Sequence, residues 1–306
     1  MTRKTRFTNL DNVSTKKTFA DLYRWQKERR NNKKDLHIKI EQAPFKEIEK
    51  LNSNRMQPSI TWIGHSTFFI QMNGVNMVTD PVWAKRMGFQ KRLTEPGIEL
   101  AALPEIDVVL ISHGHYDHLD FPTIKKLKGD PTYYVPVGLG HAFKRRGYKK
   151  VMESNWYDSF EHSNVRFSFV PAQHWTKRTL TDTNTSHWGG WIIENKEHSI
   201  YFVGDTGYFR GFQEIAKKFS IQTVLMPIGA YEPEWFMKES HITPEDAVKA
   251  FLELKGKQFI PMHYGTYHLA DDTGQAAISR LEAEWGRLHL DASQLIKLRI
   301  GETYWL

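Results

Sequence analysis

Short apolar runs recur along the chain from residue 57 onward and predict a fold rich in β-strands. Each run holds four to six residues, many of them Val, Ile, Phe or Tyr, and is bounded by polar or turn-forming residues. Asn73-Gly74 separates two of the runs and is a signal for a tight hairpin. The predicted strands are residues 60–63, 67–72, 75–79, 107–112, 132–135, 165–170, 190–194, 199–203, 223–228 and 258–262.

Helices are predicted between these strands. The clearest begins at Thr243-Pro244-Glu245-Asp246, where a capping hydroxyl precedes a proline and two acidic residues. The predicted helices are residues 122–128, 138–147, 212–219, 243–255 and 273–284. Strands with helices threaded between them suit two sheets packed face to face with helices outside. We therefore predict an α/β fold of the α+β type, arranged as a four-layer αββα sandwich.

The composition fits one large domain, or one domain with an appendage. The 306 residues are 40% hydrophobic and 25% charged, which is enough apolar material for a full core. The chain has no cysteine, which excludes disulfides, thiolate metal ligands and thiol nucleophiles. No run approaches the ~20 apolar residues of a membrane span, and no apolar segment follows the basic start. We therefore expect a cytoplasmic protein.

The net charge of +7 belongs to the N-terminal part of the chain. Residues 1–55 carry 15 Lys and Arg against 7 Asp and Glu, whereas the other 251 residues carry 27 against 28. We divide the chain into a basic extension, residues 1–56, and a main domain, residues 57–306. Because the main domain is nearly neutral and lacks an extended basic stripe, we expect no nucleic-acid partner.

The extension contains one predicted helix with an apolar stripe. Phe19, Leu22, Tyr23 and Gln26 follow helical spacing, whereas Trp25 lies off the stripe. Such a helix could rest on an anionic membrane surface or capture phosphate-bearing substrates. The alternative is that the extension packs on the main domain with its charges solvated.

Three histidines and a carboxylate lie within six residues after the strand predicted at 107–112. His113 and His115 are two residues apart and can point alike from an extended segment, and Asp117 and His118 belong to the turn that follows. Imidazole and carboxylate groups bind zinc and similar divalent cations. The segment therefore predicts a metal site, and its number of ligands suits two ions.

Three further candidate ligands follow predicted strands. His174, Asp205 and His263 each lie where a strand ends, so all three could converge on one edge of the sandwich. Seven ligands suffice for two ions. We assign His113, His115 and His174 to one ion, Asp117, His118 and His263 to the other, and Asp205 to a bridging position.

These residues together resemble the signature of the metallo-β-lactamase superfamily, whose fold is an αββα sandwich. The resemblance narrows to the N-acylphosphatidylethanolamine-hydrolysing phospholipase D family and covers roughly residues 57–270. The stretch 231–238, Tyr-Glu-Pro-Glu-Trp-Phe-Met-Lys, is specific to that family. The other motifs that carry the resemblance are residues 61–67, 79–81, 173–180, 204–208, 228–230 and 263–266.

The expected chemistry is hydrolysis with two divalent ions. The histidine-rich ligand set favours Zn²⁺, with Mn²⁺ or Fe²⁺ as alternatives. Water shared by two ions has its pKa lowered from ~15.7 toward ~7, and the resulting hydroxide would attack a phosphodiester. Asp205 would bridge the ions, and Asp117 would both bind metal and orient the hydroxide. The resemblance implies cleavage on the headgroup side, which gives phosphatidic acid and an N-acylethanolamine.

Five other polar residues have two interpretations each. His241 could contact the substrate phosphate or protonate the leaving alkoxide, or be a supporting or surface histidine. Lys177 and Arg178 could pair with an anionic headgroup, or belong to a solvated basic loop. Asp80 could accept a hydrogen bond from a ligand histidine, or stabilise its own turn. His65 could line the site or form a structural turn. The histidines that we expect to be ordinary are His37, His141, His162, His187, His198, His268 and His289.

Aromatic residues near the predicted metal rim could form an acyl-chain groove, although local cores are the commoner use of such rings. They are Trp83, Phe89, Trp175, Trp188, Tyr231, Trp235 and Phe236. Three alternative functions remain open: a lactonase or other ester hydrolase on the same metals, an RNA-processing nuclease, and a non-catalytic binding protein. The stretch 231–238 favours the lipid phosphodiesterase.

Overall fold

Strands in the first half of the chain bury both of their faces, which explains why their sequences are almost continuously apolar. In β2 (Thr67–Met72), Phe68 and Ile70 point into a core that is shared with a second sheet, whereas Phe69 points into an outer core. In β6 (Val108–Leu110), Val108 and Val109 divide between the same two cores. A sheet with two apolar faces needs another layer on each side.

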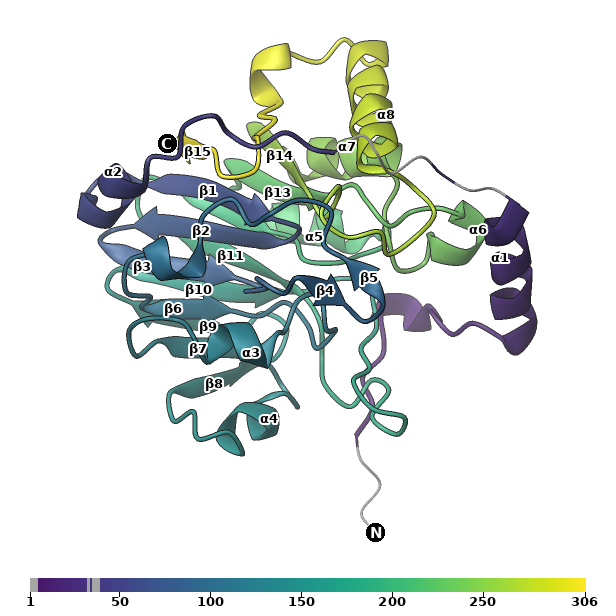
Figure 1. The fold of residues 1–306 in the computed structure, drawn as a ribbon, viewed down its shortest axis with the longest axis horizontal. Helices are drawn as coiled ribbons and strands as arrows, with labels where there is room; N and C mark the ends of the chain where they lie inside the picture. Colours follow the sequence, from purple (N-terminus) through teal and green to yellow (C-terminus); the bar gives the residue numbers. More distant parts are fainter. Residues whose placement is uncertain (1–4, 32–33, 35–38) are drawn as a thin grey trace.

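The computed structural model describes residues 5–31, 34 and 39–306, and two stacked sheets form its centre (Figure 1). The first sheet has the order β15 (Thr303–Trp305), β1 (Ser59–Gly64), β2, β3 (Val75–Thr79), β6, β7 (Thr132–Pro136) and β8 (Val151–Ser154). The second has the order β14 (Gln258–Met262), β13 (Thr223–Pro227), β12 (Ser199–Phe202), β11 (Gly190–Glu194), β10 (Val165–Val170) and β9 (Ser159–His162). A small hairpin joins β4 (Arg86–Met87) to β5 (Gln90–Lys91).

Helices cover the outer face of each sheet, and this confirms the predicted αββα sandwich. Ile124 and Phe143, from α3 (Phe121–Ile124) and α4 (Gly140–Lys144), lie in the outer core of the first sheet. On the other side, α7 (Pro244–Leu254) packs on β13 and on its neighbours α5 (Gly211–Lys218) and α8 (Gly274–Arg287). The remaining helices are α1 (Phe19–Asn31), α2 (Ile48–Ser53) and α6 (Glu234–Met237).

Local signals in the sequence correspond to the local geometry. Asn73 and Gly74 both have positive φ, 50° and 76°, as a two-residue hairpin turn requires. The Thr243 side chain accepts a hydrogen bond from the backbone N–H of Asp246 at 3.2 Å and caps α7. The helix ends before Lys255, whose φ of 56° is left-handed.

The structure corrects several predicted elements. The strand predicted at 107–112 is only Val108–Leu110, and the helix predicted at 122–128 is only Phe121–Ile124. After α3, Lys126 and Leu127 donate to carbonyls three residues earlier, so the α-helical hydrogen-bond pattern stops. The helix predicted at 138–147 shortens to Gly140–Lys144. The elements that we did not predict are β4, β5, β8, β9, β15, α2 and α6.

Ends of strands bring the candidate site residues to one edge of the sandwich. β12, β13 and β14 run parallel, as do β3, β6 and β7, so their carboxyl ends lie at a common edge within each sheet. Asp80 follows β3 directly and His263 follows β14 directly. His113 comes three residues after β6 and Asp205 three residues after β12. The topology therefore gathers these side chains, which are far apart in the sequence, into one cluster.

Residues 39–56 of the extension are built into the sandwich. The backbone N–H of Ala43 donates to the carbonyl of Ile300 at 2.9 Å. Leu51 of α2 is 1% exposed and lies in the outer core with Phe69 and Ile63. A domain boundary at residue 56 would therefore place Leu51 outside the domain whose core it packs in.

The helix of the extension, α1, packs on the main domain with a face other than its apolar stripe. Trp25, which lies off the stripe, stacks on Phe236 with ring centroids 4.8 Å apart and donates to Asp271 at 2.7 Å. The stripe residues Phe19 and Tyr23 are 91% and 72% exposed. Trp25 offers both a large ring and an N–H donor, and both find partners on the main domain.

Among the described residues, no helix has the length and apolar character needed to cross a bilayer.

Leu51→Ala tests whether α2 belongs to the folding unit. Because Leu51 is buried, we expect the free energy of unfolding to fall by about 2–5 kcal/mol in urea titrations. Met56→Ala is the control, since Met56 is 86% exposed and its truncation should change the stability by less than about 0.5 kcal/mol. Equal effects of the two substitutions would contradict this role of α2.

Candidate metal centre

Three imidazoles converge to form what we call the first histidine group: His113, His115 and His174. The Nδ1 atom of His115 lies 2.9 Å from Nε2 of His113 and 3.2 Å from Nε2 of His174. His113 and His174 are fully buried or nearly so. Three ring nitrogens within reach of one point form a set that a divalent cation can occupy.

A second group surrounds the carboxylate of Asp117. Oδ2 of Asp117 lies 3.1 Å from Nε2 of His65, 3.4 Å from Nε2 of His118 and 3.7 Å from Nε2 of His263. These four residues, which we call the second group, could also hold one cation. His65 lies beside the three residues that we assigned to one ion from the sequence. Its ring is therefore placed among the candidate ligands, whereas a residue that only supports a ligand would lie behind one.

Asp205 lies between the two groups. Its Oδ2 atom is 3.2 Å from Nε2 of His118 and 3.8 Å from Nε2 of His174, and its Oδ1 atom is 3.1 Å from Nε2 of His263. One carboxylate therefore faces both groups, as a bridging ligand must. The preceding Gly204 allows this approach, since its φ is +70° and a Cβ there would lie 2.8 Å from Cβ of Ser112.

Buried polar atoms support the fit of a divalent ion. Nε2 of His118, Nε2 of His263 and Oδ1 of Asp205 are buried and make no hydrogen bond to any residue that the structure describes. Buried polar atoms without a partner are costly, and a cluster of them indicates a ligand that binds between them. Their imidazole and carboxylate chemistry suits a cation, so His/Asp clusters of this site fit a divalent metal.

Asp80 fixes the orientation of His118. Oδ2 of Asp80 lies 2.6 Å from Nδ1 of His118, and both of its oxygens accept from Ser112, from the backbone N–H at 2.7 Å and from the hydroxyl at 2.5 Å. A carboxylate accepts only, so Nδ1 of His118 donates to Asp80 while Nε2 faces Asp205. Such a partner holds the ring and raises its basicity.

His174 is oriented by backbone contacts. Its Nδ1 donates to the carbonyl of Ser240 at 2.9 Å, which leaves Nε2 free to face the first histidine group. Its backbone N–H donates to Oδ1 of Asn9 at 2.9 Å, and the indole N–H of Trp188 donates to the same oxygen at 2.9 Å. The N-terminal extension thus supplies a buried acceptor to the loop that carries His174.

The Arg178 side chain contacts the backbone of another loop, which differs from the position expected of a cation that faces the substrate. Its Nη1 donates to the carbonyls of Gly114 at 2.8 Å, His115 at 3.3 Å and Leu119 at 3.0 Å, and its guanidinium lies 4.1 Å from the ring centre of Tyr116. Since these carbonyls belong to the segment with His115, Arg178 clamps one metal-site loop onto another. It points into protein and away from solvent.

Electrostatics link the carboxylates and imidazoles. Burial alone would raise the pKa of Asp205, but the positive charges of the neighbouring His118 and His263 hold it well below its usual range. Burial would lower the pKa of His118, yet Asp205 and Asp117 hold it well above its usual value. A ring that favours a proton on both nitrogens lies where a cation can replace one of those protons.

Left-handed backbone accumulates at the rim. The φ angles of His65, Asp80, Ala230 and His263 are 54°, 34°, 62° and 61°. A side chain in this region costs about 1–3 kcal/mol, and such residues persist where surrounding contacts fix them. Three of the four carry candidate site chemistry, so the strain lies where the side chains must be aimed.

His241 lies beside the centre, at its more open side. Its side chain is 17% exposed, and its Nδ1 is 3.9 Å from Oδ2 of Asp205. Burial lowers its pKa to about 4. Lys177 is half-buried and forms no ion pair within the part of the chain that the structure describes.

The remaining candidates differ in their surroundings. Trp188 and Tyr231 are completely buried, and Trp83 donates to the carbonyl of Ile98 at 2.8 Å, so these rings pack inside the protein. Trp235 and Phe236 contact the extension through α1. Phe89, at 99% exposure, covers nothing. Of the histidines expected to be ordinary, His187 stacks on Phe7 and contacts the ring of Trp156 at a tilt, and His37 lies outside the described residues.

Comparison with known proteins places this site in a family. The family model of the beta-lactamase superfamily domain matches residues 75–264, which is more than half of the chain. The chain belongs to the beta-lactamase superfamily. This confirms the superfamily that the motif around His113 predicts.

Two curated members of the superfamily share much of this sequence. A Caenorhabditis elegans protein named N-acyl-phosphatidylethanolamine-hydrolyzing phospholipase D 1 is 38% identical, over 68% of this chain and 64% of its own length. The Saccharomyces cerevisiae protein of the same name, termed mitochondrial, is 32% identical over 78% of this chain and 54% of its own length. The chain thus spans less than two thirds of these relatives.

A solved structure has the same fold. The crystal structure of a possible metal-dependent hydrolase from Veillonella parvula matches with a TM-score of 0.68 and 15% identity, over 82% of this chain and 100% of the other. At that identity the match concerns the fold alone, and it agrees with the two-sheet sandwich described above.

The sequence did not predict the residues whose contacts in the site involve a backbone N–H or carbonyl group. Asn9 and Ser240 contribute an amide oxygen and a carbonyl to His174, and neither has a local pattern that would reveal it. The contacts of Arg178 depend on the path of a second loop. Only the convergence of strand ends was visible in the sequence, and it concerned the ligand-type side chains.

Asp80→Ala tests the support of His118. Without the acceptor, His118 loses its orientation and Ser112 loses two bonds, so we expect the affinity for Zn²⁺ to fall about 10–100-fold in titrations against a competing chelator. Asp130→Asn, at a side chain 86% exposed, serves as the control and should bind like the unaltered protein. Unchanged affinity in Asp80→Ala would show that Asp80 only stabilises its turn.

Proposed function

We propose that this protein is a metal-dependent phosphodiesterase that cleaves N-acylphosphatidylethanolamine, or a related lipid phosphodiester, in the manner of a phospholipase D. The observation that carries the proposal is the position of Asp205, whose two carboxylate oxygens face His118 and His263 and which approaches His174. One carboxylate between two ligand groups suits a two-ion hydrolytic centre. The names of the worm and yeast relatives support the lipid substrate.

The ligand assignment follows the two groups. His113, His115 and His174 would hold one ion, Asp117, His118 and His263 the other, and Asp205 would be shared. His65 would either complete the second set or hold the carboxylate of Asp117 in place. The ligands are imidazoles and carboxylates only, a set that favours Zn²⁺. When bound, two such ions lower the pKa of water and polarise a phosphoryl oxygen.

The remaining residues would orient the water, the substrate and the ligand loops. Asp117, 14% exposed at its side chain, faces the open side and would orient the attacking water. His241 would contact the substrate phosphate, since its ring is a polar group beside Asp205 that solvent can reach. Lys177 would attract the anionic headgroup. Arg178 and Asn9 would keep the two ligand loops in register.

The reaction adds water across one phosphorus–oxygen bond. The water oxygen joins phosphorus, the bond from phosphorus to the ethanolamine oxygen breaks, and the leaving alkoxide takes up a proton. The products are phosphatidic acid and an N-acylethanolamine. Remote parts of the substrate, held by the loops around the centre, would align the phosphorus for in-line attack.

A panel of substrates with the metal-loaded full chain tests this proposal. We expect turnover of N-acylphosphatidylethanolamine and little turnover of a cyclic ester or an RNA oligonucleotide. Asp205→Asn should lower kcat by about 10²–10³-fold or more, because a shared carboxylate charge is lost. Asp130→Asn should retain activity, since its side chain is far more exposed. Faster lactone cleavage, or full activity in Asp205→Asn, would overturn the assignment.

A lipid substrate requires contact with a membrane surface, and α1 supports such contact. Phe19 and Tyr23 are exposed on the face of α1 opposite to Trp25, and the last turn of the helix carries the exposed Arg30. Apolar rings with nearby cations suit the interface of an anionic bilayer.

Vesicle sedimentation with a Phe19→Ser and Tyr23→Ser double variant tests this contact. We expect about a tenfold loss of binding to vesicles with anionic lipid, because two exposed rings no longer enter the interface. Leu252→Ser, which alters an exposed leucine on α7, is the control and should bind normally. Unaltered binding of the double variant would remove α1 from the membrane surface.

A further inference from the structure

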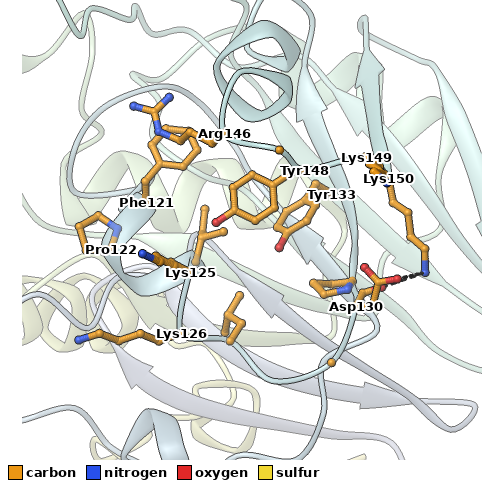
Figure 2. Close-up of a pocket in the computed structure, with 15 residues that line it drawn as sticks. Phe121, Pro122, Lys125, Lys126, Asp130, Tyr133, Arg146, Tyr148, Lys149 and Lys150 are labelled. Atoms are coloured by element: carbon orange, nitrogen blue, oxygen red, sulfur yellow. Dashed lines mark hydrogen bonds and ion pairs between the residues drawn. The ribbon is translucent and has the colours of Figure 1, made fainter.

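The structure contains a large open pocket that shares no residue with the metal centre. Its volume is about 980 Å³, and its walls come from α3 and the turn after it, from β7, and from the segment between α4 and β8 (Figure 2). A pocket of this size can accept an organic molecule, because ligand sites generally measure about 300–1,000 Å³.

Aromatic rings form the floor of this pocket. The rings of Tyr133 and Tyr148 lie with centroids 5.0 Å apart, and Figure 2 shows them in the middle of the pocket. The ring of Phe121 lies beneath Arg146, whose guanidinium is 3.9 Å from the ring centre. The hydroxyls of the two tyrosines accept or donate no hydrogen bond among the residues that the structure describes. The floor thus offers apolar faces and two unused hydroxyl donors.

Cationic side chains dominate the rim. Five basic residues and one carboxylate line the pocket, and the carboxylate, Asp130, is paired with Lys150 at 2.8 Å. Lys125, Lys126 and Lys149 form no ion pair within the described ranges 5–31, 34 and 39–306. Two segments about twenty residues apart, 125–126 and 146–150, place these charges around one pocket. A main domain that is neutral as a whole therefore has one strongly positive hollow.

We propose that this pocket is a binding site for a phosphate monoester attached to an apolar or aromatic group. The phosphate, with a charge of about −1.5 to −2 at neutral pH, would bind the ammonium groups of Lys125 and Lys126 on one side of the tyrosine rings or that of Lys149 on the other, where Figure 2 places them. The organic part would lie on the half-buried ring of Tyr148, beside the small exposed part of Tyr133, which a free inorganic ion could not use. A lipid phosphomonoester and a mononucleotide share this chemistry.

The site is independent of the metal centre in composition but adjacent to it along the chain. Phe121 begins α3 three residues after His118, and the Arg178 guanidinium that clamps the metal loop lies 5.7 Å from the same ring. Since no metal-site residue lines the pocket, its ligand would bind in the absence of metal. This property separates the proposal from the proposed reaction.

Isothermal titration of the full-length Asp205→Asn chain in the presence of a chelator tests the proposal. The ligands are dihexanoyl phosphatidic acid below its micellar concentration, AMP, inorganic phosphate and dihexanoyl phosphatidylcholine. We expect phosphatidic acid or AMP to bind about tenfold more tightly than inorganic phosphate, and the tighter of the two identifies the natural source. Equal affinity for inorganic phosphate, or for the zwitterionic phosphatidylcholine, would overturn the proposal.

Two sets of variants locate the binding. Lys125→Gln with Lys149→Gln should weaken the tighter ligand about tenfold, because charge-assisted hydrogen bonds are lost. Lys196→Gln with Lys257→Gln removes two exposed charges elsewhere and should leave the affinity unchanged. Tyr148→Ala should weaken the organic ligand but not inorganic phosphate. Retained affinity in the Lys125 and Lys149 variant, with thermal unfolding as a check of folding, would refute the site.

Discussion

The contact between His118 and two buried carboxylates governs the organisation of the site. Asp80 holds Nδ1 of His118 at 2.6 Å, and Asp205 faces Nε2 at 3.2 Å. Charges this deeply buried are tolerated only when they are paired and hydrogen-bonded. The rim loops that start at β3, β6 and β12 must therefore meet at fixed positions, and Ser112, Gly204 and the left-handed backbone of Asp80 allow them to do so.

Most of the sandwich could be predicted because its strands are buried on both faces and thus stand out as apolar runs. Strands that we did not predict, such as β9 and β15, lie at the edges of the sheets. Because β9 alternates exposed and half-buried residues and β15 is half-buried throughout, neither forms a continuous apolar run. Their pairing, for example Ile60 opposite Tyr304, depends on partners far away in the sequence. Local pattern cannot encode such a partner.

The ligand-type residues of the site could also be predicted, because each follows a strand end and strand ends share an edge. Contacts made by Asn9 and Arg178 could not, since both bind backbone carbonyls or N–H groups and any residue type can supply those. Net charge was also an incomplete guide. The compensating acids of the main domain lie elsewhere, so the sum conceals the lysines around Tyr133 and Tyr148.

Asn9 has a consequence for the order of folding. Its partners His174 and Trp188 lie 165 and 179 residues later in the chain. During synthesis the N-terminal segment emerges first, yet its buried acceptor has no donors until more than half of the protein has been made. Contacts of such long sequence separation form slowly. The loop that carries His174 thus gains its buried acceptor only through a contact between two widely separated parts of the chain.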